Sequence, residues 1–121
     1  MIKIGVIGYG YWGPNLVRNF AELKGAEMAA VADLDPKKLE IVNKRYPAIT
    51  TTTDFQQLLR DPNVDAIAIA TPVSTHFELA MAALKAGKHV WLEKPMTETS
   101  LQARQLVETA VRQLGGYDIE I

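Results

Sequence analysis

The chain has 121 residues and a mass of 13.4 kDa, enough for one domain with a buried core and too little for a two-domain enzyme. Hydrophobic residues make up 48% and charged residues 22%, so we expect a compact soluble fold rather than a disordered chain. The formal net charge of -1 argues against nucleic-acid binding, and the absence of cysteine excludes disulfides, thiolate nucleophiles and zinc-thiolate sites.

Short apolar segments alternate with helical patterns along the chain. We expect strands, covered on both faces as in a parallel sheet, at residues 2–7, 27–33, 66–70 and 89–92, with a further short strand at 50–53. Apolar residues at helical spacing predict a helix after each strand, with the stripes Leu16, Phe20 and Leu23; Leu39, Val42 and Tyr46; Phe55, Leu58 and Leu59; Phe77, Ala80, Met81 and Leu84; and Ala103, Leu106, Val107, Ala110, Val111 and Leu114.

Capping signals support the expected helices. Asp35 followed by Pro36 predicts the start of the second helix, and Asp54 predicts the start of the third. Gly25 and Gly87 stand where the first and fourth helices should end, because glycine tolerates the left-handed conformation of a helix C-terminus.

This order of elements predicts an α/β fold of the Rossmann type, a doubly wound parallel sheet with helices on both faces. We assign residues 1–121 to one dinucleotide-binding domain. The ending GGYDIEI, residues 115–121, alternates apolar and acidic side chains, which predicts an atypical edge strand. No segment reaches the roughly 20 apolar residues of a membrane span and no export signal is present, so we expect a cytoplasmic protein without membrane contacts or a metal site.

A glycine-rich turn, GYGYWGPN, follows the first predicted strand. Gly8 permits a tight turn, Gly10 lets a pyrophosphate approach the backbone, and Gly13 lets the next helix pack closely on the strand. The helix start that follows presents free N–H groups to an anion. A glycine-rich turn without a ligand is the alternative.

Asp33 lies 20 residues beyond Gly13, at the end of the second predicted strand. A carboxylate there accepts hydrogen bonds from ribose hydroxyls and repels a 2′-phosphate, and the next residue, Leu34, is not the arginine that would bind that phosphate. The sequence therefore favours NAD over NADP. Lys37 and Lys38 leave some doubt, although a solvated first helical turn explains both, and Asp33 itself could be a helix cap or a surface residue.

Two later motifs sharpen this interpretation: ATPVSTH at residues 70–76 and GKHVWLEKP at 87–95. Together with GYGYWGPN and VADLDP, they make the chain resemble the N-terminal domain of the Gfo/Idh/MocA family of NAD(P)-dependent oxidoreductases, over residues 1 to about 114. The resemblance implies hydride transfer between nicotinamide and a sugar or cyclitol hydroxyl. The Tyr-Trp-Gly-Pro-Asn continuation is most similar to members acting on nucleotide sugars or similar sugars.

The resemblance also implies site residues. Thr71 and Pro72 would line the nicotinamide end, Glu93 would contact the nicotinamide-side ribose, and Lys94 would point into the substrate site as the catalytic residue. Pro95 follows a cis bond in the family, whereas a trans turn is the default from sequence alone. A surface lysine after an apolar strand is the alternative for Lys94.

Four more residues are candidates with alternatives. Thr75, or Ser74 before it, could instead cap the following helix, and His76 could border the nicotinamide or be solvated or capping. Tyr11 and Trp12 are not needed for phosphate binding, so we place them at the rim of the nicotinamide pocket or on a face covered by another domain.

Family members carry a second, substrate-binding domain that this sequence does not include, and with it the usual acid/base histidine. We therefore expect the chain to be an excised, engineered or reduced domain that binds NAD(H) without turnover. A binding or scaffold module without catalysis is the alternative, and an S-adenosylmethionine-binding module is a third. Apolar surface left uncovered near Trp91 predicts a homodimer.

Overall fold

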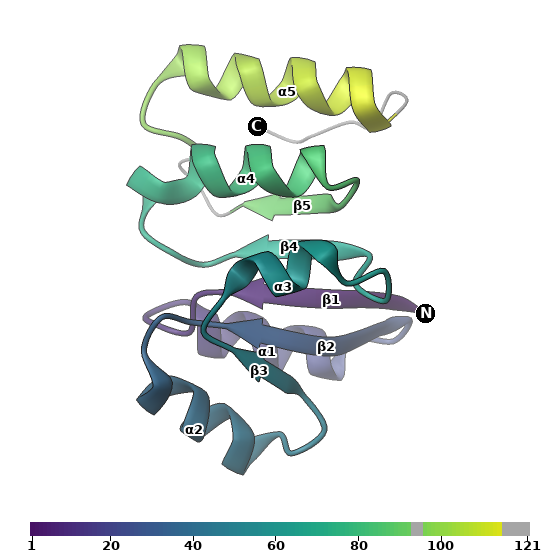
Figure 1. Cartoon of the computed structure of the whole chain (residues 1–121), viewed down its shortest axis with the longest axis vertical. Coiled ribbons are helices and arrows are strands. Elements are labelled where there is room, and N and C mark those ends of the chain that lie inside the picture. Colours follow the sequence, from purple (N-terminus) through teal and green to yellow (C-terminus); the bar gives the residue numbers. More distant parts are fainter. Residues whose placement is uncertain (93–95, 115–121) are drawn as a thin grey trace.

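The computed structural model describes residues 1–92 and 96–114 of the chain (Figure 1). Its elements alternate between strand and helix along the sequence. They are β1 (Ile2–Ile7), α1 (Gly13–Glu22), β2 (Ala26–Ala32), α2 (Pro36–Arg45), β3 (Thr50–Thr52), α3 (Phe55–Arg60), β4 (Ala66–Ile69), η1 (Val73–Thr75, a 3-10 turn), α4 (His76–Lys85), β5 (His89–Leu92) and α5 (Ser100–Leu114).

The five described strands form one parallel sheet in the order β3-β2-β1-β4-β5. The chain therefore first builds outward from β1 to β3, then crosses back to place β4 on the other side of β1. Because all strands run the same way, their carboxyl ends lie on one edge of the sheet, on the left in Figure 1. Ligands of open α/β sheets bind outside this edge, near the point where the strand order reverses.

Helices cover both faces of the sheet, and each face has its own buried apolar cluster. In Figure 1, α1 lies behind the sheet and α3 in front of it. One cluster packs α1 and α2 on the sheet through residues such as Val17 and Val42, and the other packs α3, α4 and α5 through residues such as Leu84 and Leu106. The predicted doubly wound α/β fold is confirmed.

The predicted helix signals are also confirmed. The side chain of Asp35 accepts a hydrogen bond from the N–H of Lys37, and that of Asp54 accepts one from the N–H of Gln56. Gly25 and Gly87 have φ angles of 86° and 81°, which an L side chain rarely adopts. The turn chemistry thus sets where these helices begin and end.

Some details of the prediction are wrong. Val111 was expected to face the core but is 50% exposed on α5, and Leu23 is exposed because α1 ends at Glu22 and Leu23 is its C-cap residue. β2 ends at Ala32, which places Asp33 beyond the strand, and β4 ends at Ile69. The predicted edge strand at 115–121 and the Leu114 side chain lie outside the described residues.

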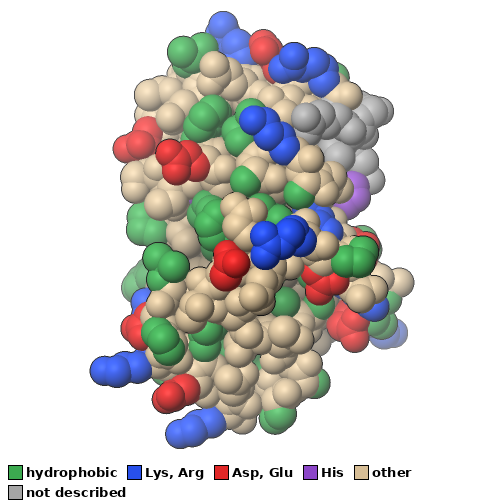
Figure 2. Space-filling view, viewed as in Figure 1, with side chains coloured by type: hydrophobic (Ala, Val, Ile, Leu, Met, Phe, Trp, Pro, Cys, Tyr) green, Lys and Arg blue, Asp and Glu red, His purple; other side chains and the backbone are tan. Residues whose placement is uncertain are grey.

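Charges are spread over the surface. Figure 2 shows acidic and basic side chains interspersed on the viewed face, with no broad area of one sign. Within residues 1–92 and 96–114, no helix is long and apolar enough to cross a bilayer. The same part of the chain has no group of three or more His, Asp or Glu residues placed to hold a metal ion.

Candidate functional site

Three turns converge at the carboxyl edge, the edge of the sheet where β1, β2 and β4 end. The N–H of Gly8, after β1, donates to the carbonyl of Ala32 at the end of β2 at 2.8 Å. On its other side Gly8 packs on the turn after β4, where a Cβ added to it would lie 2.9 Å from Cγ2 of Thr71. The edge thus brings the glycine-rich turn, Asp33 and the Thr-Pro turn together.

The three glycines of the turn serve three different needs. Gly8 has a φ of 100°, in the left-handed region that favours glycine. A Cβ on Gly13 would overlap the carbonyl oxygen of Gly8, so only glycine lets α1 begin this close to the end of β1. Gly10 faces open space, and the one atom near an added Cβ is Nζ of Lys38 at 3.6 Å. Of the three glycines in this turn, Gly10 is therefore the one that leaves room for an anion to approach the backbone.

The N-terminus of α1 opens at this turn without a cap. Its N-cap residue is Trp12, which makes no side-chain cap hydrogen bond, and Pro14 occupies the first turn. By contrast, aspartates cap α2 and α3. The first-turn N–H groups of α1 and the positive end of its dipole are consequently left for an external acceptor, which suits a phosphate.

Asp33 joins the glycine-rich turn to the β2–α2 turn. Its Oδ2 accepts from the N–H of Tyr9 at 2.7 Å, and its Oδ1 accepts from the N–H of Asp35 at 2.8 Å. A carboxylate offers about four acceptor positions, so two remain for ligand hydroxyls. Asp33 as a whole is half-buried. The interpretation as a simple helix cap is wrong, because Asp35 caps α2.

Tyr9 is a residue of the site that the sequence did not point to. Its ring is 6% exposed and belongs to the cluster under α1 and α2, while its N–H is the group that Asp33 holds. Burial raises the pKa of the Tyr9 hydroxyl above its usual value, and the Tyr46 hydroxyl adds to this, whereas the Arg45 guanidinium lowers it. The turn is therefore anchored by a side chain as well as by its glycines.

The Thr-Pro turn after β4 is held by its own hydroxyls. Oγ1 of Thr75 lies 2.6 Å from the carbonyl oxygen of Pro72 and 2.6 Å from Oγ1 of Thr71. Since Thr75 has one hydroxyl hydrogen and gives it to Pro72, Thr71 must donate to Thr75. Thr75 is the N-cap residue of α4 by position, but its side chain makes no cap hydrogen bond. The alternative in which the Thr75 side chain caps α4 is wrong, because its hydroxyl closes the turn instead.

His76 is buried, with 3% of its surface exposed, so the interpretation of a solvated histidine is wrong. Its Nε2 lies 2.9 Å from the carbonyl oxygen of Thr71 and its Nδ1 lies 3.1 Å from that of Met96. Both partners are carbonyl oxygens, which only accept, so the tautomer decides which ring nitrogen donates. His76 thereby connects the Thr-Pro turn to the segment that begins at Met96.

Exposed apolar side chains surround the carboxyl edge. Tyr11 is 85% exposed and Leu34 is 87% exposed. The rings of Tyr11 and Trp12 contact each other edge to face with centroids 4.9 Å apart, and Trp12 is also exposed. On β5, the partly exposed Trp91 makes an edge-to-face contact with Phe20 of α1 at 5.7 Å. Tyr11, Trp12 and Leu34 are thus exposed beside the turns of the site, whereas Phe20 lies in the last turn of α1 and packs against the core.

The remaining predicted residues, Glu93, Lys94 and Pro95, lie outside the described residues, so the catalytic role predicted for Lys94 stays a prediction. The flanking positions are placed. Leu92 pairs with Ile69 of β4, and the carbonyl oxygen of the buried Met96 contacts the ring of His76.

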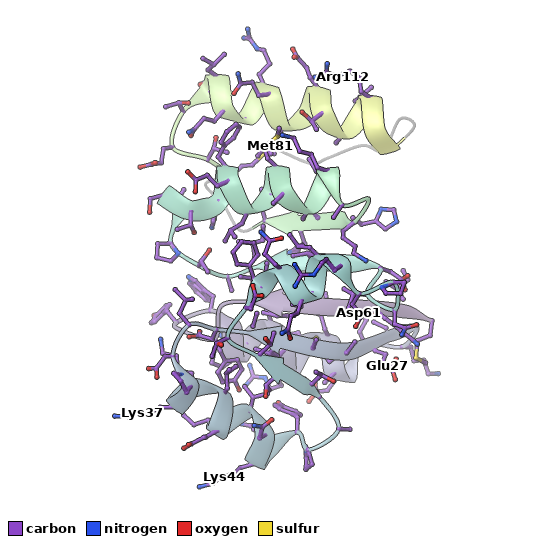
Figure 3. The ribbon with its side chains drawn as sticks, in the orientation of Figure 1. Glu27, Lys37, Lys44, Asp61, Met81 and Arg112 are labelled. Carbon is purple, nitrogen blue, oxygen red and sulfur yellow. The ribbon has the colours of Figure 1, made fainter. Side chains whose placement is uncertain are left out.

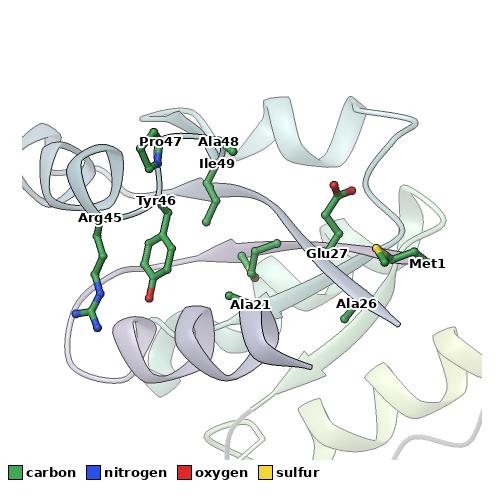
Figure 4. Close-up of a pocket in the computed structure, with 10 residues that line it drawn as sticks. Met1, Ala21, Ala26, Glu27, Arg45, Tyr46, Pro47, Ala48 and Ile49 are labelled. Atoms are coloured by element: carbon green, nitrogen blue, oxygen red, sulfur yellow. The ribbon is translucent and has the colours of Figure 1, made fainter. Parts of the chain in front are cut away.

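A shallow cleft of about 400 Å³ lies at the opposite edge of the sheet (Figure 4). It is formed where β2 begins and α2 ends, with a mainly apolar lining of Met1, Ala21, Ala26, Glu27, Met28, Arg45, Tyr46, Pro47, Ala48 and Ile49. Its few polar groups do not converge on a point, as those of a small-molecule site do. The candidate site is therefore the carboxyl edge.

Comparison with known proteins agrees with this geometry. The sequence profile described as "Oxidoreductase family, NAD-binding Rossmann fold" matches residues 2–115. The chain is 43% identical over 106 residues to an uncharacterized oxidoreductase, YdgJ, of Escherichia coli, covering 87% of this chain and 30% of that protein. It is 34% identical over 108 residues to inositol 2-dehydrogenase of Acidothermus cellulolyticus, covering 88% and 32%.

Solved structures share the fold. Scyllo-inositol dehydrogenase from Lactobacillus casei, with bound NAD(H) and scyllo-inositol, superposes with a TM-score of 0.87 at 26% identity. The match covers 96% of this chain and 34% of that one. The chain thus spans about a third of the length of these relatives.

Proposed function

Because the chain belongs to the Gfo/Idh/MocA oxidoreductase family, we propose that it binds NAD(H) at the carboxyl edge. The observation that carries this proposal is the uncapped start of α1, which opens at a glycine-rich turn pinned to Asp33. The pyrophosphate would lie at Gly10 and the first-turn N–H groups of α1. The adenosine ribose would donate to the free acceptor positions of Asp33.

We expect NAD to be preferred over NADP. A 2′-phosphate would meet the carboxylate of Asp33, and the exposed Leu34 beside it has no group to bind that phosphate. Binding of NAD(H) by the solved L. casei relative supports the same cofactor class.

We also propose that the nicotinamide lies near the turn of Thr71 and Pro72 and near Glu93. Hydride transfer to or from a sugar or cyclitol carbon needs a group that exchanges the hydroxyl proton, and we assign this role to Lys94. Relatives named as inositol dehydrogenases support such a substrate class. Because the chain spans only about a third of its relatives, we expect cofactor binding without measurable turnover from these 121 residues.

A scaffold module without a ligand is the second candidate, and a homodimer through the exposed aromatic surface around Trp91 is compatible with either function. The interspersed charges in Figure 2 support the expectation that nucleic acid is not a partner. A cytoplasmic location remains a prediction.

Calorimetric titration with NAD and NADP tests the proposal through Asp33→Asn, which removes the charge and leaves one side-chain oxygen to accept from either Tyr9 or Asp35. We expect the variant to bind NAD about tenfold more weakly, because a charge-assisted hydrogen bond to the ribose is lost. Asp61→Asn is the matched control, since Asp61 follows α3 at the opposite edge, where its carboxylate accepts from the N–H of Asn63. If a folded wild-type sample gives no heat of binding with millimolar NAD, NAD(H) binding is excluded and the scaffold module is the candidate that remains.

A further inference from the structure

His76 begins α4, directly after the Thr-Pro turn, and its ring lies between two segments of the chain. Its Nε2 lies 2.9 Å from the carbonyl oxygen of Thr71, and its Nδ1 lies 3.1 Å from that of Met96. Only 3% of its surface is exposed, so the ring offers almost no area for a ligand to contact. His76 can therefore act on a ligand only through the two backbone segments that it holds.

The contact of His76 with Met96 differs in kind from the other bonds of the Thr-Pro turn. The hydroxyls of Thr71 and Thr75 bond to each other and to the carbonyl of Pro72, so they tie the turn to itself. The ring of His76 instead reaches a segment 20 residues along the chain, beyond β5. Because β4 and β5 are neighbouring parallel strands, this ring bridges the segments that follow the two strands.

Resting on the proposed function, we infer that His76 is a positioning residue for the nicotinamide end of the cofactor. By holding the carbonyl of Thr71, it fixes the turn of Thr71 and Pro72, against which the nicotinamide would lie. A turn that is ordered before binding lowers the entropy cost of holding the nicotinamide there. The parts of the cofactor that bind at Gly10 and Asp33 do not depend on this ring.

The test compares the binding of NADH with that of ADP-ribose, which lacks the nicotinamide. The ratio of the two affinities measures what the nicotinamide contributes. We expect His76→Phe, which keeps a ring but has no N–H, to lower that ratio roughly fivefold while ADP-ribose affinity stays within about twofold of wild type. His76→Gln, whose amide N–H takes the place of Nε2 and donates to Thr71, should restore most of the ratio. His76→Asn, whose amide lies near the position of Nδ1, should not.

Lys88 provides a matched control at the other edge of the sheet. Its side chain is also buried, and its Nζ donates to the carbonyls of Asp61 and Val64. Asp61 lies on the right in Figure 3, at the edge opposite the carboxyl ends of the strands. Lys88→Met and His76→Phe each take a buried partner away from two carbonyls, so both should unfold at a lower temperature than wild type. Only His76→Phe should change the ratio of NADH to ADP-ribose affinity.

An unchanged ratio in His76→Phe would overturn the inference, as would equal losses for NADH and ADP-ribose, which a purely structural role predicts. If His76→Phe does not fold, recovery by His76→Asn rather than His76→Gln would overturn the assignment to Thr71. A wild-type chain that binds NADH and ADP-ribose equally would also overturn the inference, because the nicotinamide would then gain nothing from this chain. A wild-type chain that binds neither compound would contradict the proposed function instead.

Discussion

The β1–α1 turn and the β2–α2 turn join strand to helix at the same edge of the sheet, yet they treat the backbone N–H groups of the helix in opposite ways. Both helices have a proline in their first turn. The start of α2 is closed by Asp35, whose side chain accepts from Lys37, whereas the start of α1 has no side-chain cap. A self-satisfied helix start is structural, and an open one beside glycines is a place for an anion.

Asp33 makes the two turns interdependent. One of its oxygens accepts from the glycine-rich turn and the other from the start of the capped turn. The open turn has no cap of its own, but its neighbour supplies a side chain that accepts a hydrogen bond from its backbone. Such prior ordering lowers the entropy cost of binding a ligand.

The largest effect is expected from Gly13→Ala. The added Cβ would overlap the carbonyl oxygen of Gly8, so the start of α1 must move, and we expect a loss of about 3 kcal/mol or more in the free energy of unfolding. Urea denaturation measures it.

Gly10→Ala is the matched control. Its Cβ meets only Nζ of Lys38 at 3.6 Å, an ordinary contact distance, so stability should change by less than about 1 kcal/mol while NADH affinity falls. Similar losses of stability in both variants would contradict the different roles of the two glycines.

Giving the open turn a carboxylate of its own should remove its anion site. In Trp12→Asp a negative charge stands at the N-cap of α1, where it competes with the pyrophosphate, so we expect NADH affinity to fall by about tenfold or more. Titration at constant ionic strength, with Trp12→Asn as the uncharged control, measures it.

Removing the cap from the closed turn provides the opposite comparison. Asp35→Ala should cost about 1 kcal/mol of stability and leave NADH affinity within about twofold of wild type, since the backbone N–H from which Asp33 accepts is kept.

If Trp12→Asp left NADH binding unchanged, the missing side-chain cap of α1 would have no bearing on ligand binding.

The smallest effect concerns Tyr9, which anchors the open turn. Because the pKa of its hydroxyl is raised in the folded state, the protonated form is favoured there, and the associated stability is present below about pH 10 and lost as pH rises through the folded-state pKa. Unfolding free energy should thus fall more steeply above pH 10 in wild type than in Tyr9→Phe. Parallel pH profiles of the two proteins would show that the Tyr9 hydroxyl is not linked to folding.

Local signals were enough for the fold and for part of the site. Apolar runs predicted the strands, and the spacing from Gly13 to Asp33 placed a carboxylate beside the glycine-rich turn, because both follow strands that pair side by side. The contact between Gly8 and Thr71 follows from the same rule. Because β4 pairs in parallel with β1, the turns after these two strands lie side by side.

The remaining features depend on tertiary contacts. Which of Lys37 and Lys38 faces the turn is set by how α2 rotates when Leu39 and Val42 enter the core. The position of His76 at the start of a helix suggests a solvated side chain. In the structure its ring instead contacts the carbonyl oxygens of Thr71 and Met96, five and 20 residues away in sequence. Tyr9 stands between Gly8 and Gly10 in a turn, where no hydrophobic periodicity predicts whether a side chain is buried.

The double engagement of Asp33 also limits how a cofactor preference could be redesigned. The carboxylate that would repel a 2′-phosphate is the same group that holds Tyr9 and Asp35 in place, so exchanging it for a neutral residue loosens the turn on which both cofactors depend. The side chain of Leu34 is 87% exposed and, being apolar, accepts no hydrogen bond from the turn. A redesign of cofactor preference is therefore less constrained at position 34 than at position 33.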